Sequence, residues 1–296
     1  MSYSRDFKGY GKNDFKVEWP KKAKLALQFV LNYEEGGENC ILNGDKYSEN
    51  FLSEIIGAQP LEARNMNMES IYEYGSKRGF WRIFNTFSDR QINLTIFGVG
   101  LALEKNNEVC SAIKESNFEI ASHGYRWIDY QNIDKEIEKE HIIRCNESIK
   151  DIFGSYPKGW YTGRVSPNTR NLVIENTNVI YDSDSYSDDL PYWDKNSQKK
   201  HLIIPYTLDN NDMRFATNQG FNCGDQFFTY LKDSFDTLYE EGKNYPKMMS
   251  VGLHCRLIGR PGRMKSLNKF LDYVQKFDDV WICKREQIAD YWYENY

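Results

Sequence analysis

Residues 25–36 read Leu-Ala-Leu-Gln-Phe-Val-Leu-Asn-Tyr-Glu-Glu-Gly, so that an apolar run ends in two adjacent carboxylates. A nearly continuous apolar run is typical of a strand that is buried on both faces of a parallel sheet. Reactive groups of such sheets gather where the strands end, which marks Glu34 and Glu35 as candidate catalytic acids. Their mutual repulsion favours a raised pKa for one of them, as a general base requires. The alternative is a pair of solvated acids in a turn.

The same arrangement recurs along the chain. Residues 93–99 predict a second strand, and four further apolar segments end in polar or ionisable clusters. These clusters begin at Ser122, Gly159, Asp182 and His254. Strands that alternate with helices indicate parallel βαβ units, and polar groups at their carboxyl ends favour a barrel. The sequence therefore predicts an α/β fold, a TIM-like or incomplete (β/α) barrel.

Helix signals lie between the predicted strands. Asp134 is a candidate N-cap for a helix that Gly154 closes, and Ser166 followed by Pro167 predicts another helix start. Apolar periodicity predicts further helices over residues 226–238 and 264–277.

Composition limits the class of protein. The 296 residues suit one domain, 1–296, in which residues 1–22 form an N-terminal extension. A net charge of -5 gives no electrostatic footprint for nucleic acid. We find neither a secretion signal nor an apolar stretch long enough to span a membrane, and the six dispersed cysteines are expected to be reduced thiols, so a cytoplasmic location is expected.

The chain has only four histidines. His141 falls within a predicted helix and His201 within a lysine-rich approach to a strand, so both are expected to be structural or exposed. His123 and His254 each follow a predicted strand, where they could join the acids in one site or be ordinary structural histidines. Cys255 adjoins His254, but neighbouring side chains of a strand point to opposite faces, which disfavours it as a nucleophile.

Several strings resemble one family. Asn32-Tyr33-Glu34-Glu35-Gly36, Ser122-His123-Gly124-Tyr125-Arg126-Trp127, Gly159-Trp160-Tyr161 and Leu253-His254 occur in the order of the polysaccharide deacetylase (NodB-homology) superfamily. Residues 29–38, 122–130 and 252–261 are most similar to the purine-catabolic allantoinases of that superfamily. The resemblance implies a cytoplasmic hydrolase that opens the ring of allantoin, a cyclic amide, in purine degradation. It also implies a homo-oligomer, a tetramer.

One departure from the deacetylase pattern bears on metal binding. By that pattern Glu34 stands at the position of the base, whereas Glu35 and His123 stand at metal-ligand positions. Trp127 replaces the second metal histidine, and an indole offers only an N–H donor. The resemblance therefore implies a metal-independent enzyme without cofactor, and the alternative is one divalent ion such as zinc held by Glu35, His123 and another group.

A mechanism without metal assigns a role to each candidate. Glu35 would activate water with Glu34 as its neighbour or replacement, while His123 and His254 would transfer protons or stabilise the oxyanion. The remaining candidates would bind substrate: three arginines for its oxygens, three aromatic residues as a flat wall, and Asp184, which could orient a histidine. They are Arg164, Arg256, Arg260, Trp127, Tyr125, Tyr161 and Asp184.

Each assignment has an alternative. The arginines could pair with acids across loops, the aromatic residues could belong to the core, and Asp184 could be a solvated turn residue. Two other functions also remain open from the sequence. One is a metal-dependent carbohydrate N-deacetylase, and the other is a non-catalytic relative that binds a carbohydrate or metabolite.

Overall fold

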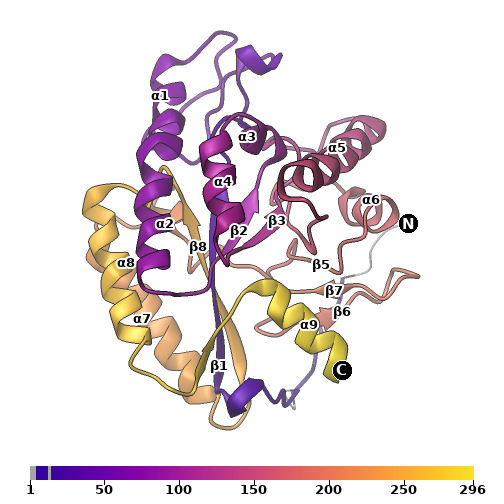
Figure 1. The fold of residues 1–296 in the computed structure, drawn as a ribbon, viewed down its shortest axis with the longest axis vertical. Helices are drawn as coiled ribbons and strands as arrows, with labels where there is room; N and C mark the ends of the chain where they lie inside the picture. Colours follow the sequence, from indigo (N-terminus) through magenta and orange to yellow (C-terminus); the bar gives the residue numbers. More distant parts are fainter. Residues whose placement is uncertain (1–4, 13–14) are drawn as a thin grey trace.

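A computed structural model describes residues 5–12 and 15–296 (Figure 1). Its strands form one sheet in the order β6-β7-β5-β4-β3-β2-β1-β8, with β9 paired to β1. All pairings are parallel except that of β6 with β7. The strands are β1 (Leu25–Tyr33), β2 (Thr95–Gly98), β3 (Glu119–Ser122), β4 (Gly159–Trp160), β5 (Tyr181–Asp182), β6 (Tyr192–Trp193), β7 (Leu202–Ile203), β8 (Lys247–His254) and β9 (Val280–Ile282).

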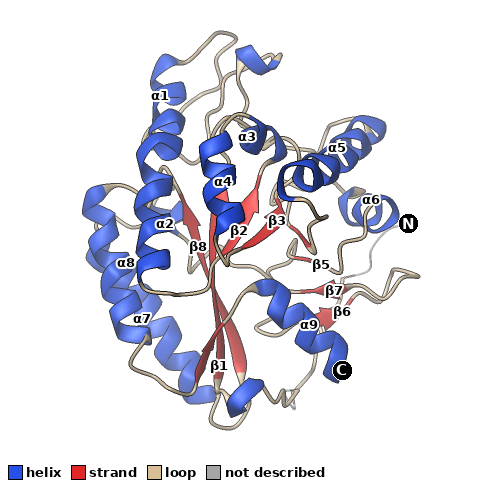
Figure 2. Cartoon of the chain, in the orientation of Figure 1, coloured by secondary structure: helices blue, strands red, loops and turns tan. Residues whose placement is uncertain are grey.

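Helices surround the curled sheet, and α7, α8 and α2 lie together beside β1 and β8 (Figure 2). They are α1 (Met66–Tyr74), α2 (Phe80–Asp89), α3 (Gly100–Glu104), α4 (Asn107–Glu115), α5 (Lys135–Phe153), α6 (Thr169–Asn176), α7 (Gly224–Glu241), α8 (Pro261–Val274) and α9 (Arg285–Asn295). A π-helical turn, η3 (Gly75–Gly79), joins α1 to α2 without a break. Short 3-10 helices are η1 (Pro20–Lys22), η2 (Ile41–Asn43) and η4 (Asp212–Ala216).

Strand β1 organises the sheet. One of its edges pairs with β8 over Leu25–Asn32, and the other is shared by β2 and β9. On the far side of β8, the described residues show only an isolated bridge between Gly252 and Asn211. The sheet therefore curls without closing, which confirms the incomplete form of the predicted barrel.

Arg285, at the start of α9, joins β8 to the chain that follows β7. Its guanidinium donates to Ser250 of β8 at 2.8 Å and to the carbonyl of Pro205, just after β7, at 2.9 Å. It also donates to Gln28 of β1 at 3.0 Å. This side chain is fully buried, so it replaces part of the hydrogen bonding that a closed barrel would supply between strands.

Two helix predictions had different outcomes. The side chain of Asp134 accepts from the backbone N–H of Glu136, and Gly154 ends α5 with a φ of 86°, as the sequence predicted. The predicted start at Ser166 and Pro167 was wrong, because α6 begins at Thr169 with Asn168 at its N-cap. The Ser166 hydroxyl accepts from the backbone N–H of Asn168 at 3.0 Å and donates to Glu138 of α5 at 2.6 Å, so it also serves a tertiary contact.

Part of the expected N-terminal extension belongs to the core. Val17 and Trp19 are buried against α9, and the Trp19 indole donates to the carbonyl of Lys247 at 2.9 Å. Residues 1–4 and 13–14 of that extension lie outside the described residues. The six cysteines are free thiols, as expected. Within the described chain, we find no helix with the length and apolar character that crossing a membrane requires.

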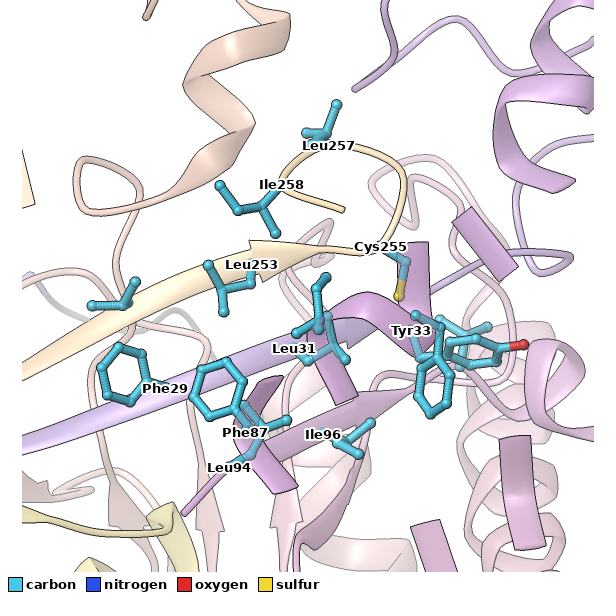
Figure 3. Close-up of a cluster of buried hydrophobic side chains, with 14 of the residues drawn as sticks. Phe29, Leu31, Tyr33, Phe87, Leu94, Ile96, Leu253, Cys255, Leu257 and Ile258 are labelled. Atoms are coloured by element: carbon cyan, nitrogen blue, oxygen red, sulfur yellow. The ribbon is translucent and has the colours of Figure 1, made fainter. Parts of the chain in front are cut away.

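The main core lies between the sheet and the helices beside it. Phe29, Leu31 and Tyr33 of β1 pack with Phe87 of α2 and Leu253 of β8 (Figure 3). These side chains alternate along β1 with others that face the inside of the curl, and both faces are buried. Burial on both faces fixes the register of β1, and thereby the position of the acids that follow it.

The loop after β8 is held against η3 by very close packing. A Cβ atom on Gly79 would lie 1.9 Å from the carbonyl oxygen of Cys255, and one on Gly259 would lie 2.5 Å from Gly79 Cα. Only glycine permits this approach of two backbones. The residues that follow His254 are therefore fixed relative to the helix that covers the carboxyl end of β1.

Candidate active site

Three of the predicted catalytic residues meet at the carboxyl ends of their strands. Asn32 of β1 pairs in register with His254 of β8, and Gly98 of β2 pairs with Ser122 of β3. This register brings Glu34, His123 and His254 together, although they are far apart in the sequence. Each has at most 4% of its surface exposed.

Glu34 lies at the centre of the cluster. Its Oε1 atom is 3.1 Å from His123 Nε2 and 3.5 Å from His254 Nε2. Its Oε2 atom is 2.6 Å from Arg256 Nη2. Burial raises the pKa of a carboxyl group, but Arg256, His254 and the hydrogen bond with His123 together hold the pKa of Glu34 well below its usual range. Glu34 is therefore ionised at neutral pH.

His254 is oriented by Asp212, the first residue of η4. Its Nδ1 atom is 2.6 Å from Asp212 Oδ1, and its backbone N–H donates to Asp212 Oδ2 at 2.8 Å. Burial opposes protonation, but the charges of Asp212 and Glu34 raise the pKa of His254 to about 9. Because both ring nitrogens face carboxylates, the structure favours an imidazolium that can donate a proton.

His123 is oriented by a backbone carbonyl. Its Nδ1 atom lies 3.1 Å from the oxygen of Tyr161, which can only accept, so Nδ1 carries a proton. Its Nε2 atom is the one that faces Glu34, at 3.1 Å from Oε1. His123 and Glu34 are thus positioned to exchange a proton.

Glu35 points away from the histidines. Its Oε1 atom lies 3.4 Å from Arg256 Nη1, and its Oε2 atom accepts from the backbone N–H of Glu34 at 3.1 Å. A Cβ atom on Gly75 would lie 2.4 Å from Glu35 Oε1, so this carboxyl group fits under η3. Burial raises its pKa, as does the charge of Glu34, while Arg256 opposes the rise. The acid pair therefore differs in surroundings as well as in pKa.

Arg256 contacts the acid pair directly. Its guanidinium is fully buried and lies over the rings of Tyr72 and Trp127, 4.2 Å and 5.1 Å from their centroids. Trp127 is itself buried and stacks on Phe51 with centroids 6.1 Å apart. Both predicted residues thus border the acids.

Tyr161 also borders the cluster. Its ring centroid lies 5.0 Å from that of His123 and 4.8 Å from that of Tyr206. The hydroxyl of Tyr206 in turn accepts from the amide of Asn32, two residues before Glu34. Tyr161 therefore supports His123 through both its ring and its carbonyl.

Two predicted substrate-binding residues lie elsewhere. Tyr125 donates to Glu104 at 3.0 Å and lies under Arg144 of α5, so its ring belongs to the packing between α3 and α5. Asp184 accepts from the backbone N–H groups of Thr162 and Gly163 instead of orienting a histidine. Burial and the charge of Asp182 raise the pKa of Asp184 to about 7. Asp184 therefore holds the loop that follows β4.

The other two predicted arginines pair with acids across loops. Arg164 lies 3.3 Å from Glu49, and its guanidinium also lies over the Trp127 ring, 4.7 Å from the centroid. Arg260 lies over Tyr74 at 3.7 Å and 3.8 Å from Glu54. Of the three predicted arginines, Arg256 is the one that the structure places at the acid pair.

The groups expected to hold a metal do not converge. Glu35 contacts Arg256, whereas His123 contacts Glu34, and Trp127 has no acceptor to offer. Among residues 5–12 and 15–296, no group of three His, Cys, Asp or Glu side chains has the arrangement of metal ligands. The donor set does not fit a catalytic zinc site, which takes three protein ligands.

The remaining histidines and Cys255 have structural surroundings. His201 is buried, and its Nε2 atom lies 2.9 Å from Asp182 Oδ2. His141 forms a hydrogen bond of 3.0 Å with the hydroxyl of Tyr130. Cys255 is fully buried, and burial raises the pKa of its thiol well above the usual range. A thiol of this kind is a poor nucleophile.

Comparison with known proteins gives consistent matches. The family model described as Polysaccharide deacetylase matches residues 67–177. A Schizosaccharomyces pombe protein described as a polysaccharide deacetylase is 43% identical over 99% of this chain and 98% of its own. Two crystal structures superpose over nearly the whole of both chains. One is a protein of Pseudomonas aeruginosa PAO1 described as a polysaccharide deacetylase, 56% identical with a TM-score of 0.97 over 99% of each chain. The other is PuuE allantoinase, 54% identical with a TM-score of 0.98 over 100% of this chain and 99% of that chain.

Sequence reasoning missed two residues of the site. Asp212 lies in a segment rich in Asp and Asn, where nothing distinguishes it from a turn residue. Tyr72 lies in α1, a helix with no strong apolar periodicity that was not predicted. Their importance depends on tertiary contacts with His254 and Arg256, which a single sequence does not contain.

We expect Asp212→Asn to lower the pKa of His254 from about 9 by roughly 1 to 3 units, because an opposite charge in contact is lost. Histidine NMR signals followed against pH would measure this. In the parent, protonation of His254 stabilises the fold fully below pH 6.5, and this contribution is lost as pH rises through about 9. The free energy of unfolding should therefore fall over that range, and fall less in the variant.

The His201 signal in the same spectra is the control, since its partner Asp182 is unchanged. An unchanged pKa of His254 in the variant would show that Asp212 does not set its protonation.

Proposed function

The chain belongs to the polysaccharide deacetylase family, and from this premise we propose that it is an allantoinase, which opens the hydantoin ring of allantoin to give allantoate. Its similarity to PuuE allantoinase extends over the full chain, and this observation carries the proposal. The chain is thus a hydrolase that acts on a C–N bond of a cyclic amide. Purine degradation in the cytoplasm is the corresponding biological setting.

The geometry supports Glu34 as the general base. A base must first lie within reach of its proton, and Glu34 is the acid that contacts both histidines. The sequence analysis assigned the base to Glu35, and burial does raise the pKa of Glu35, but its carboxyl group lies under η3. We therefore assign the role of general base to Glu34, and we propose that Glu35 holds Arg256 in position.

The reaction then needs one water and two proton transfers. Glu34 takes a proton from water as its oxygen adds to a ring carbonyl carbon. The C–N bond breaks, and the imidazolium of His254 donates a proton to the departing ring nitrogen. His123 and Arg256 face the same carboxylate and can stabilise the oxyanion that forms in between. We propose that this chemistry proceeds without a metal ion, which the donor set of the site supports.

A carbohydrate N-deacetylase is less consistent with the site. Glu34, His123 and His254 are nearly inaccessible in this structure. An oligosaccharide needs a long open groove beside its acetamido group, whereas a small ring can be enclosed. Enclosure therefore favours a small-molecule substrate over a polymer.

The direct test is allantoin hydrolysis measured with and without a chelator on the same preparation. We expect the rate to change by less than about twofold on chelation, because no proposed step uses a metal. A rate that is lost on chelation and restored by zinc would contradict the metal-independent mechanism. Hydrolysis of an N-acetylated oligosaccharide with none of allantoin would contradict the proposed substrate.

The two acids can be separated by matched amide variants. We expect Glu34→Gln to lower kcat by about 100-fold or more, since it removes the general base. Glu35→Gln keeps the shape of the side chain and leaves Glu34 beside the histidines, so we expect a smaller loss. The opposite order of the two losses would return the role of base to Glu35.

We also propose that the enzyme is a homotetramer. Large apolar side chains are exposed in the segment between β1 and α1, which supports burial of this surface against other copies. They include Leu42, Ile56 and Leu61, each at least 46% exposed, and Met66 at the start of α1 is exposed as well. Light scattering should give four times the chain mass of 34.9 kDa. A mass of one chain would exclude the assembly.

A further inference from the structure

Amide hydrolysis places negative charge on a carbonyl oxygen, and an enzyme needs a positive group or fixed donors at that place. A metal ion can supply this charge, but the donor set of this site does not fit one. The positive group must therefore be a residue of the chain that is held where the charge develops.

Arg256 is held in place at every part of its head group. Its Nε atom donates to the carbonyl of Leu52 at 2.7 Å. Its Nη1 and Nη2 atoms lie 3.4 Å from Glu35 and 2.6 Å from Glu34. The rings of Tyr72 and Trp127 lie beside its plane. A guanidinium with fixed position and direction is preorganised, so it needs no rearrangement when charge develops.

The backbone at Leu52 indicates that this position is imposed. Leu52 has a φ of 47°, in the left-handed region that a leucine rarely adopts. Its carbonyl accepts the Nε bond of Arg256, and its side chain is buried in the main core. Unfavourable backbone conformations persist where the surrounding structure requires them, and they are concentrated at functional sites.

The contact with Glu34 leaves hydrogen-bonding capacity unused. Arg256 Nη2 and Glu34 Oε2 are buried and 2.6 Å apart, and within the described residues neither atom has a hydrogen-bond partner besides the other. Nη2 carries two N–H groups and only one of them faces Glu34, so the second can be directed to another oxygen.

From these contacts we propose that Arg256 is the catalytic cation of this site. Its guanidinium, fixed by Leu52, Tyr72 and Trp127, stabilises the oxyanion. It also occupies the space beside the acid pair that a divalent ion would need. This inference rests on the proposed hydrolysis for its catalytic part. Trp127 is accordingly a positioning residue for Arg256, and replacing Trp127 with histidine does not by itself create a metal site.

The kinetic test compares two variants of Arg256 with a matched control. We expect Arg256→Met to lower kcat for allantoin by roughly 100- to 1000-fold, the usual effect of losing one oxyanion donor. Arg256→Lys keeps the charge, so we expect it to recover about tenfold of that loss without reaching the parent, because an ammonium cannot contact both acids in this geometry.

The control is Arg263→Met. Arg263 likewise pairs with a glutamate, Glu54 at 2.6 Å, and lies over an aromatic ring, Phe215 at 4.4 Å, but it does not contact the acid pair. We expect its kcat to stay within about threefold of the parent, as for other mutations away from the chemistry. An Arg256→Met variant within threefold of the parent, or an Arg256→Lys variant no better than Arg256→Met, would overturn the catalytic role.

A second measurement does not depend on activity. Zinc retained after gel filtration is determined for the parent, for Trp127→His and for the double variant Trp127→His/Arg256→Ala. We expect about one equivalent only in the double variant, because a guanidinium beside the acids repels a dication. One equivalent retained by Trp127→His alone, or none by the double variant, would overturn the exclusion of metal by Arg256.

The two measurements keep the proposals distinguishable. A parent that does not hydrolyse allantoin refutes the proposed function and, with it, the catalytic part of the inference. The zinc content of the variants still decides whether Arg256 occupies the place of a cation.

Discussion

Two carboxylates buried at the end of β1 impose a requirement that the surrounding structure meets. Removing an ion from water costs several kcal/mol even after relaxation, and a carboxylate without a partner would take up a proton instead. Glu34 stays ionised because positive or proton-bearing groups reach it from three other places in the chain, at His123, His254 and Arg256. The same groups that make the buried charge tolerable are those that chemistry on an amide needs.

Backbone register brings these partners together. Parallel pairing of β1 with β8 sets Asn32 opposite His254, and the chain continues from there to Arg256. The close approach of Gly79 to Cys255 then fixes the loop that carries the guanidinium. Side chains far from the acids thus determine the site through the position of two backbones.

The strand ends could be predicted from the sequence because they depend on local patterns. The apolar run before Glu34 and the positions of His123 and His254 are visible in short windows of sequence. The register of the parallel sheet then brings these strand ends together. The directions of neighbouring side chains were harder to predict. Glu34 and Glu35 are adjacent in sequence but have different partners, and Tyr125 turns to α5 instead of the acids. Asp212 lies in a short 3-10 helix, which leaves little periodic signal.

The position of β1 also has a consequence for synthesis of the protein. Its pairing with β2 can form early, but β8, β9 and the joining side chain Arg285 lie far along the chain from β1 and leave the ribosome much later. Gln28 and Arg285, which are hydrogen-bonded in the fold, are 257 positions apart. One edge of the most apolar strand therefore remains open while most of the protein is made, and an open apolar edge is where nascent chains associate wrongly. The architecture that fixes the acid pair makes its production depend on protection of the unfinished sheet.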